Sequence, residues 1–305
     1  MAPEVNPQPA APQSVPSPAY GAVYDRGNAH YEAARLGRRQ AFRALVRYSA
    51  GRALGRRKKW TSKIIPFALY IIAAGMTAII VGIQAFVGRF SGEQVLGYAQ
   101  FFGFIFIIEG LFVATIAPEM LCPDRRENVL TLYFSKAITR LDYVLAKLTA
   151  AALLTLTISF VPAALLWLFF NLLADSPLRA LGDNIADLGR IAIIGGLIAL
   201  YLGAIGMAIA SFTGRKAIAV VAIIVGYIVT EAIVNSLAQA LADNPIADWI
   251  TFLSPAVIIN SLAQSLFPFD NGLELAFHWW AYALGMLATI AVATGITVWR
   301  YLPER

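Results

Sequence analysis

Six long apolar runs constrain the fold of this 305-residue chain more than any other feature. A helix needs about 20 mostly apolar residues to cross a hydrocarbon core of roughly 30 Å, and each run is long enough. We place the spans at residues 64–87, 98–117, 145–170, 190–212, 217–238 and 278–300. The sequence therefore predicts an all-α fold: a polytopic membrane protein with six transmembrane helices, in a domain over residues 61–305.

The composition excludes a water-soluble enzyme. Hydrophobic residues make up 59% of the chain and charged residues 14%, whereas soluble domains have about 45–50% and about 25%. The net charge of +6 would suggest nucleic acid as the partner of a soluble protein. No motif that reads RNA or DNA accompanies the charge, so we expect no nucleic-acid partner. The single cysteine, Cys122, excludes an internal disulfide.

The positions of the basic residues predict the orientation. Of the 24 lysines and arginines, 21 lie before the first span, in the second and fourth connections, or at the end of the chain. The other three are Arg89, Arg179 and Arg190, which lie on the opposite side with eight acidic residues. Because basic residues accumulate in cytoplasmic loops, we expect a multi-pass protein of the cytoplasmic (inner or plasma) membrane with both termini cytoplasmic.

The N-terminal region has two parts. Residues 1–30 are rich in proline and alanine, a composition that cannot bury a core, and they predict a disordered cytoplasmic tail. Residues 31–60 are basic and predict an amphipathic interfacial helix, or elbow helix.

The predicted elbow helix has two distinct sides. Phe42, Leu45 and Ser49 recur at spacings of three and four, whereas Arg43 and Arg47 fall on the opposite side. A basic cluster with an indole follows and would anchor the helix to an anionic lipid surface: Arg56, Arg57, Lys58, Lys59 and Trp60. A plain solvated basic arm is the alternative.

The fifth connection, residues 239–277, is long and contains no lysine or arginine. Its two apolar stretches, residues 249–253 and 255–267, are too short to cross a membrane at 1.5 Å per residue. We expect them to form external re-entrant or interfacial helices. Ser254 followed by Pro255 is a helix N-cap with proline at the first helical position.

The second connection, residues 118–148, has a pattern that membrane insertion does not require. Asp124 with Glu127, and Thr139 with Asp142, have the spacing of a capping box, which predicts two short cytoplasmic helices. The first would expose Arg125, Arg126 and Glu127 at its start and carry Val129, Leu132 and Tyr133 along one side. A charged tip with an apolar flank suits docking into a groove of another protein.

This connection resembles the corresponding loop of the ABC-2 permeases, the membrane subunits of one class of ATP-binding-cassette transporters. The resemblance lies in an acidic-basic cluster, a leucine/tyrosine run, a serine, an arginine and a lysine at the third span: residues 124–127 and 130–133, Ser135, Arg140 and Lys147. The topology is also similar. The chain departs from the pattern at Cys122 and Pro123 and in its proline-rich tail, and its short first external loop excludes family branches with a large domain there.

The resemblance implies a mechanism. The helix after the second span would be a coupling helix that fits a cleft in an ATPase subunit; its contact residues would be Asp124, Arg125, Arg126, Glu127, Leu130 and Tyr133. Two ATPase subunits and a second permease, identical or homologous, would complete an exporter. This chain has no GxxxxGK[ST] phosphate loop, so we expect it to be no enzyme and to bind no cofactor, with ATP and Mg on the partner ATPase.

Two acidic residues, Glu109 and Glu231, lie inside spans. An aspartate at a helix centre costs about 2.5–3.5 kcal/mol on insertion scales, so each glutamate should face protein, face a water-filled path or be protonated. They are candidates for a membrane pathway. A helix-helix hydrogen bond, or for Glu231 a position near the end of its span, is the alternative. His278 beside two tryptophans is better explained as an interfacial belt residue than as a metal ligand.

Two other functions are open to a chain of this class. A secondary transporter or channel of six spans predicts internal repeats with paired broken helices, which the sequence does not show. An intramembrane enzyme needs a nucleophile with a base, or a metal cluster, and the chain has two histidines, one of them in the tail.

Overall fold

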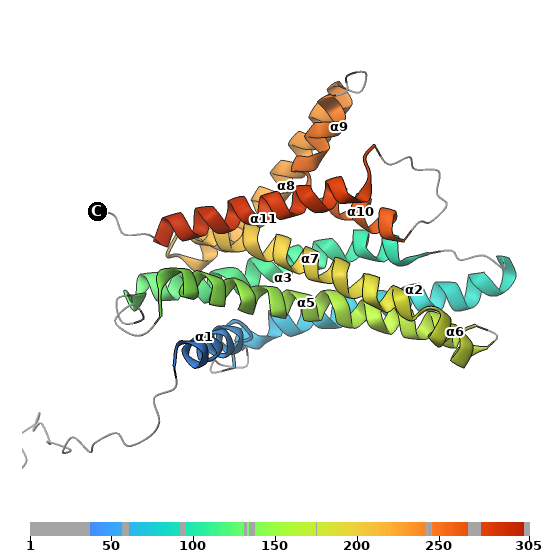
Figure 1. Cartoon of the computed structure of the whole chain (residues 1–305), viewed down its shortest axis with the longest axis horizontal. Coiled ribbons are helices and arrows are strands. Elements are labelled where there is room, and N and C mark those ends of the chain that lie inside the picture. Colours follow the sequence, from blue (N-terminus) through green and yellow to red (C-terminus); the bar gives the residue numbers. More distant parts are fainter. Residues whose placement is uncertain are drawn as a thin grey trace, which may run out of the picture. The chain divides into compact units, whose positions relative to one another are not determined.

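The computed structural model describes residues 37–56, 61–91, 96–130, 133, 138–174, 176–241, 244, 246–267 and 276–301, with the backbone only at 61–62 and 88–91. This part of the chain is helical and contains no strand. Its elements are α1 (Arg38–Ala53), α2 (Thr61–Ser91), α3 (Tyr98–Arg126), α5 (Arg140–Leu172), α6 (Pro177–Asp183), α7 (Ile185–Ala210), α8 (Lys216–Ala240), α9 (Ile246–Ile250), the 3-10 helix η1 (Thr251–Leu253), α10 (Pro255–Leu266) and α11 (Trp279–Tyr301) (Figure 1). The predicted tail at residues 1–30 lies outside the described residues.

Six of the described helices are long and apolar enough to cross a membrane: α2, α3, α5, α7, α8 and α11. The all-α class and the number of candidate spans are therefore confirmed. The largest difference from the predicted boundaries is in α3, which continues to Arg126 instead of ending at residue 117. Pro118 and Pro123 lie inside this helix and are buried. Each proline removes one backbone hydrogen bond, and packing of the surrounding turns compensates for that loss.

The centre of the fold is formed by α3 and α7, the two spans with the largest buried share. The helices α3, α5, α7 and α11 run side by side (Figure 1). Gly203 and Gly206 face two neighbours of α7, and only at Gly206 would a Cβ come too close. A Cβ on Gly203 would lie 3.8 Å from Ala151 Cβ of α5, and a Cβ on Gly206 would lie only 2.3 Å from Val113 Cγ1 of α3. Gly206 therefore permits an approach of α3 that any larger residue would block.

The helix α1 has the predicted distribution of side chains. Leu45, Ser49 and Ala53 are buried, whereas Arg43 and Arg47 are exposed. The buried side packs against α5 and α3 of the same chain. The sequence analysis predicted an interfacial helix but did not predict that neighbouring helices would cover this side. A place for α1 at a membrane surface stays a prediction.

A capping box begins α5, as predicted. Thr139 Oγ1 accepts a hydrogen bond from the Asp142 backbone N–H at 3.2 Å, and Asp142 accepts one from the Thr139 N–H at 3.0 Å. Arg38 of α1 donates to both carboxylate oxygens of Asp142 at 2.7 Å. The capping box begins the long span helix itself, so the prediction of a separate short helix here is wrong.

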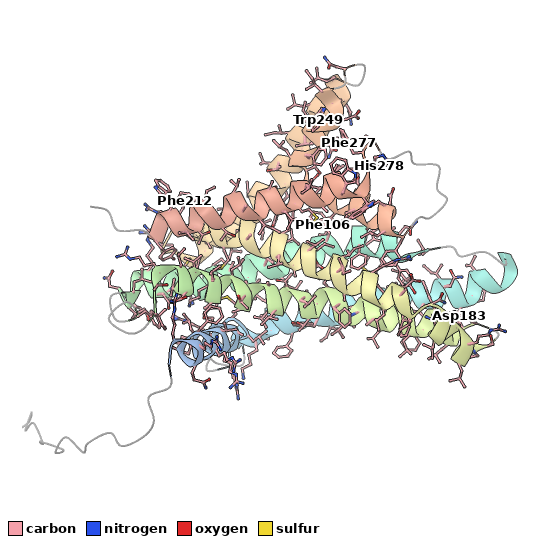
Figure 2. All side chains as sticks on the ribbon, viewed as in Figure 1. Phe106, Asp183, Phe212, Trp249, Phe277 and His278 are labelled. Atoms are coloured by element: carbon pink, nitrogen blue, oxygen red, sulfur yellow. The ribbon has the colours of Figure 1, made fainter. Side chains whose placement is uncertain are left out.

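The fifth connection contains the predicted short helices. Ser254 Oγ accepts a hydrogen bond from the Val257 N–H at 3.0 Å and Pro255 is the first residue of α10, which confirms the predicted N-cap. The segments before and after Ser254 are bent by 102°. Figure 2 shows Trp249, Phe277 and His278 near the start of α11, with Phe212 near the opposite end. The re-entrant or interfacial position of α9 and α10 in a membrane stays a prediction.

Candidate functional site

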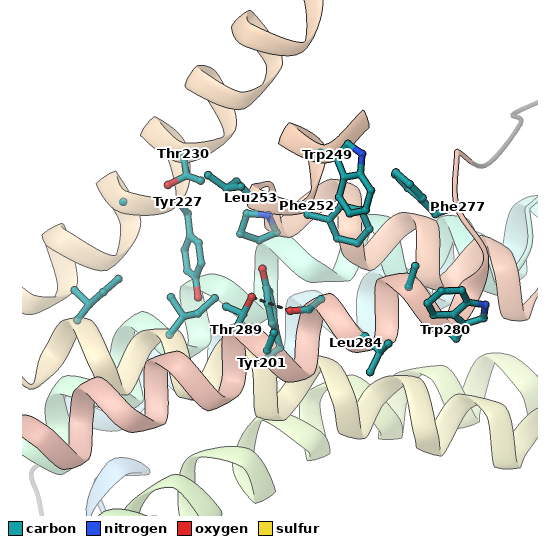
Figure 3. A pocket seen from close by; sticks show the side chains of 17 residues that line it. Tyr201, Tyr227, Thr230, Trp249, Phe252, Leu253, Phe277, Trp280, Leu284 and Thr289 are labelled. Carbon is teal, nitrogen blue, oxygen red and sulfur yellow. Dashed lines mark hydrogen bonds between the residues drawn. The ribbon is translucent and has the colours of Figure 1, made fainter. Parts of the chain in front are cut away.

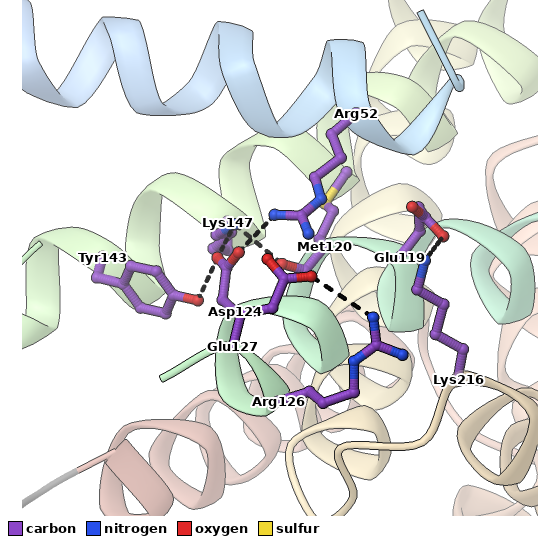
Figure 4. Close-up of polar contacts among 9 residues, drawn as sticks. All are labelled: Arg52, Glu119, Met120, Asp124, Arg126, Glu127, Tyr143, Lys147 and Lys216. Carbon is purple, nitrogen blue, oxygen red and sulfur yellow. Dashed lines mark hydrogen bonds and ion pairs between the residues drawn. The ribbon is translucent and has the colours of Figure 1, made fainter. Parts of the chain in front are cut away.

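A buried ion network lies where α1, α3 and α5 meet (Figure 4). Its centre is Asp124, in the last turn of α3, whose side chain has no exposed surface. One carboxylate oxygen accepts from Arg52 Nη1 of α1 at 2.5 Å. The other accepts from Lys147 Nζ at 2.7 Å and from the Tyr143 hydroxyl at 2.9 Å, both in α5. A single carboxylate thus connects three helices.

The network is electrostatically demanding because Lys147, like Asp124, has no exposed side-chain surface. Lys147 Nζ also donates to the Met120 carbonyl oxygen at 2.9 Å, one turn before Asp124. Removing one member of a buried ion pair costs about 3–5 kcal/mol, since the other charge stays buried without compensation. The three helices are therefore expected to move together at this end of the protein.

The end of α3 differs from the prediction. The sequence analysis placed the start of a helix at Asp124, whereas α3 ends there in a Schellman motif. Asn128 adopts φ 52°, its N–H donates to the Arg125 carbonyl at 3.4 Å, and the Val129 N–H donates to the Asp124 carbonyl at 3.2 Å. Asparagine tolerates this left-handed conformation, which stops the helix. The predicted capping box of Asp124 with Glu127 is therefore wrong.

The exposed part of this site is the turn that follows α3. The side chains of Arg126 and Glu127 are 68% and 51% exposed and lie 3.5 Å apart at their charged atoms. The adjacent Arg125 points elsewhere and donates to the Ser211 carbonyl oxygen at the end of α7. We call Arg126 and Glu127 the exposed charge pair.

The two remaining predicted contact residues are partly buried. Leu130 and Tyr133 pack against the core, and the rings of Tyr133 and Tyr143 lie 5.7 Å apart. Burial, with the charge of Asp124 adding to it, raises the pKa of the Tyr133 phenol to about 12, so the phenol is neutral at physiological pH. The six predicted coupling residues thus divide into an exposed pair and four residues that attach it to the helices.

Several basic side chains at this end bind helix carbonyls. Arg125 binds the end of α7, Arg140 Nη1 donates to the Tyr301 carbonyl of α11 at 2.9 Å, and Lys147 binds α3. A helix C-terminus carries unpaired carbonyls and partial negative charge, so cations stabilise it. The sequence analysis used these residues for topology, for the family resemblance and, in the case of Arg125, as a coupling contact, but not as partners of helix ends. Because these residues lie beside the ends of predicted spans, their positions in the sequence could have indicated that they bind helix carbonyls.

A second ion pair connects α3 with α8 near the same end of the protein. Lys216 at the start of α8 donates to Glu119 of α3 at 2.7 Å, with both side chains partly exposed. The predicted lipid anchor is described only at Arg56, an exposed residue just after α1. The other anchor residues, at positions 57–60, lie outside the described residues.

The two acidic residues within spans have different surroundings. Glu109 of α3 is fully buried, and neither carboxyl oxygen has a hydrogen-bond partner among the described residues. Glu231 of α8 accepts from the Ser254 hydroxyl at 2.6 Å and from the Ala256 N–H at 2.8 Å. Glu231 thus binds the N-terminus of α10, which is the interhelical hydrogen bond given above as the alternative. A pathway role for either residue stays a prediction.

The arrangement joins three helices through one carboxylate and leaves two charged side chains exposed in the following turn. Among the described residues, no group of three histidine, cysteine, aspartate or glutamate side chains could hold a metal ion. No family model matches the chain, and no curated protein matches it at a significant level.

Proposed function

We propose that this chain is the permease subunit of an ABC-2 type transporter, an exporter driven by ATP hydrolysis on a separate ATPase subunit. The permease would form the substrate path with a second permease copy, identical or homologous, and two ATPase copies would bind ATP and Mg. The observation that carries this proposal is the exposed charge pair at Arg126 and Glu127, two and three residues beyond the buried carboxylate of Asp124.

The position of the exposed charge pair supports a coupling role. A protein that pushes on this turn displaces the end of α3, and with it Asp124. Because Asp124 is bonded to Arg52 and Lys147 in a buried network, the displacement is transferred to α1 and α5. Tightly packed elements transmit small shifts as movements of whole helices.

The charge distribution supports a cytoplasmic position for this end. Arg125, Arg140 and Lys216 lie at the end that carries α1, whereas Asp183 and Asp187 lie in or beside α6 at the other end. By the positive-inside rule, the α1 end faces the cytoplasm. In this orientation α1 is the elbow helix on an anionic inner leaflet, and α9 and α10 are the external re-entrant helices.

Purification of the tagged full-length chain from its own membranes tests the proposal. We expect an ATPase subunit with a phosphate loop to co-purify, as identified by mass spectrometry. The double variant Arg126→Ala with Glu127→Ala should release this subunit while the melting temperature of the permease stays the same, because both side chains are exposed.

A matched control is available at the opposite end. Arg179 and Asp183 of α6 form another exposed pair of the same charges, with side chains 84% and 73% exposed. Their double alanine variant should retain the ATPase. Absence of any ATPase from the parent preparation, or equal retention by both double variants, would show that the coupling assignment is wrong.

A further inference from the structure

A cavity of about 770 Å³ lies between α7, α8, α9, η1, the start of α10 and the first half of α11 (Figure 3). Six aromatic side chains supply much of its wall: Tyr201, Tyr227, Trp249, Phe252, Phe277 and Trp280. Ligand sites in proteins are typically about 300–1,000 Å³ and are lined by apolar and aromatic groups with few polar ones. The size and the wall of this cavity match those of a small-molecule site.

The aromatic wall is held together by its own contacts. The ring of Phe252 stacks on Tyr282 at 5.4 Å and on Trp249 at 6.0 Å, and Phe277 lies 5.0 Å from Trp249. Phe252 can approach α11 because Gly285 has no side chain; a Cβ there would lie 2.8 Å from Phe252 Cδ1. Rings fixed in this way favour a ligand that is itself built from rings.

The wall includes one buried hydroxyl, that of Tyr227, which has no hydrogen-bond partner among the described residues. The Thr289 hydroxyl, by contrast, already donates to the Gly285 carbonyl at 2.9 Å. The Tyr227 side chain points from α8 toward α7 and α11 in Figure 3, and its ring lies against Gly110 of α3. A buried donor without a partner is costly, so an acceptor atom placed there would bind favourably.

The wall also restricts the charge and the route of a ligand. None of the described residues that line the cavity carries a charge, so no counter-charge offsets the desolvation cost of an ion and the wall favours an uncharged ligand. Leu253, Trp280 and Leu284 line the cavity and are more than half exposed on the sides of candidate spans or their connection. The lining residues of α11, from Trp280 to Thr289, extend over roughly 14 Å at 1.5 Å per residue. A bilayer is the solvent that meets such a surface.

We propose that this cavity binds an uncharged, ring-containing apolar molecule with one hydrogen-bond-accepting oxygen, which enters from the membrane and bonds to the Tyr227 hydroxyl. Binding does not depend on an ATPase partner, so a failure of the coupling assignment leaves this proposal standing and the reverse also holds.

Benzophenone has two rings and one carbonyl oxygen, and it crosslinks to nearby C–H groups under ultraviolet light. Vesicles that contain this chain alone should show saturable labelling of peptides from α8, η1 and α11. Dibenzyl ketone should compete with the labelling more strongly than bibenzyl, which lacks the oxygen. Tyr227→Phe should raise the half-saturating concentration by about 5-fold, as expected for one lost hydrogen bond.

Filling the cavity gives a second test. Ala288 lines the cavity and Ala291, one turn further along α11, does not. Ala288→Trp should remove the saturable labelling and Ala291→Trp should retain it. Labelling that does not saturate in the parent chain, or that is equal in the two tryptophan variants, would show partition into lipid only. Equal competition by the ketone and the hydrocarbon would overturn the assignment of the Tyr227 hydroxyl. This comparison uses the parent chain, so it does not depend on whether the Tyr227→Phe variant folds.

Discussion

The carboxylate of Asp124 and the ammonium of Lys147 lie 2.7 Å apart, and neither side chain has any exposed surface. The pair connects the last turn of α3 with the first turns of α5. The exposed charge pair, Arg126 and Glu127, follows Asp124 by two and three residues at the end of α3. The proposed docking surface is thus connected to α1 and α5 through one ion network.

Asp124→Asn should destabilise the protein strongly. The substitution keeps the shape of the side chain but leaves the buried Lys147 and the partly exposed Arg52 without a counter-charge, and the stranded Lys147 alone should cost about 3–5 kcal/mol. The matched control is Glu119→Gln, which removes a carboxylate from the partly exposed pair with Lys216 and should cost about 0–1 kcal/mol. The apparent melting temperature in detergent measures both.

The same experiment has a rescue arm. Lys147→Met removes the buried ammonium that Asp124→Asn strands, so the double variant should melt above the Asp124→Asn single variant. Additive losses in the double variant would mean that Asp124 and Lys147 are not energetically coupled.

Glu231→Ala should loosen the start of α10. Glu231 accepts two hydrogen bonds there, from the Ser254 hydroxyl and the Ala256 N–H, and alanine leaves both donors without this partner. Hydrogen exchange followed by mass spectrometry should become faster in peptides from residues 254–266 and stay the same in α5. Glu231→Gln retains one acceptor oxygen and should have a smaller effect. Equal exchange in the parent and the alanine variant would exclude a structural role for Glu231 at this helix.

Single cysteines should report opposite accessibility at the two ends of the helices. The only native cysteine, Cys122, is buried, so Cys122→Ala provides a simple background. On intact cells, a membrane-impermeant maleimide should label Asp183→Cys beside α7 and not Arg215→Cys before α8, because the positive-inside rule places Arg215 in the cytoplasm. After the cells are opened, both should react. Labelling of Arg215→Cys alone on intact cells would reverse the topology.

Local patterns predicted much of the fold. The six apolar runs form six long helices. An apolar helix of that length satisfies its own backbone hydrogen bonds in a bilayer, so its sequence alone is enough to predict it. The N-cap at Ser254 and the capping box at Thr139 and Asp142 were also correct, because a cap is made by residues at most three positions apart.

The errors concern residues whose partners are distant in sequence. Asp124 has the spacing of a helix cap with Glu127, yet its carboxylate binds Arg52 and Lys147 on two other helices. Asn128, whose left-handed backbone ends α3, was the local signal that the sequence analysis did not use.

The sequence by itself determined the class, the number of candidate spans and the uneven distribution of basic residues. The length of an apolar run and the position of a charge are properties of each segment and do not depend on tertiary contacts. Only the tertiary structure decided that α1 covers its apolar side with α5, that Asp124 is buried and that Glu231 binds the start of α10. The physical reason is the same in each case: a buried polar group must find a partner, and packing, not spacing along the chain, chooses which one.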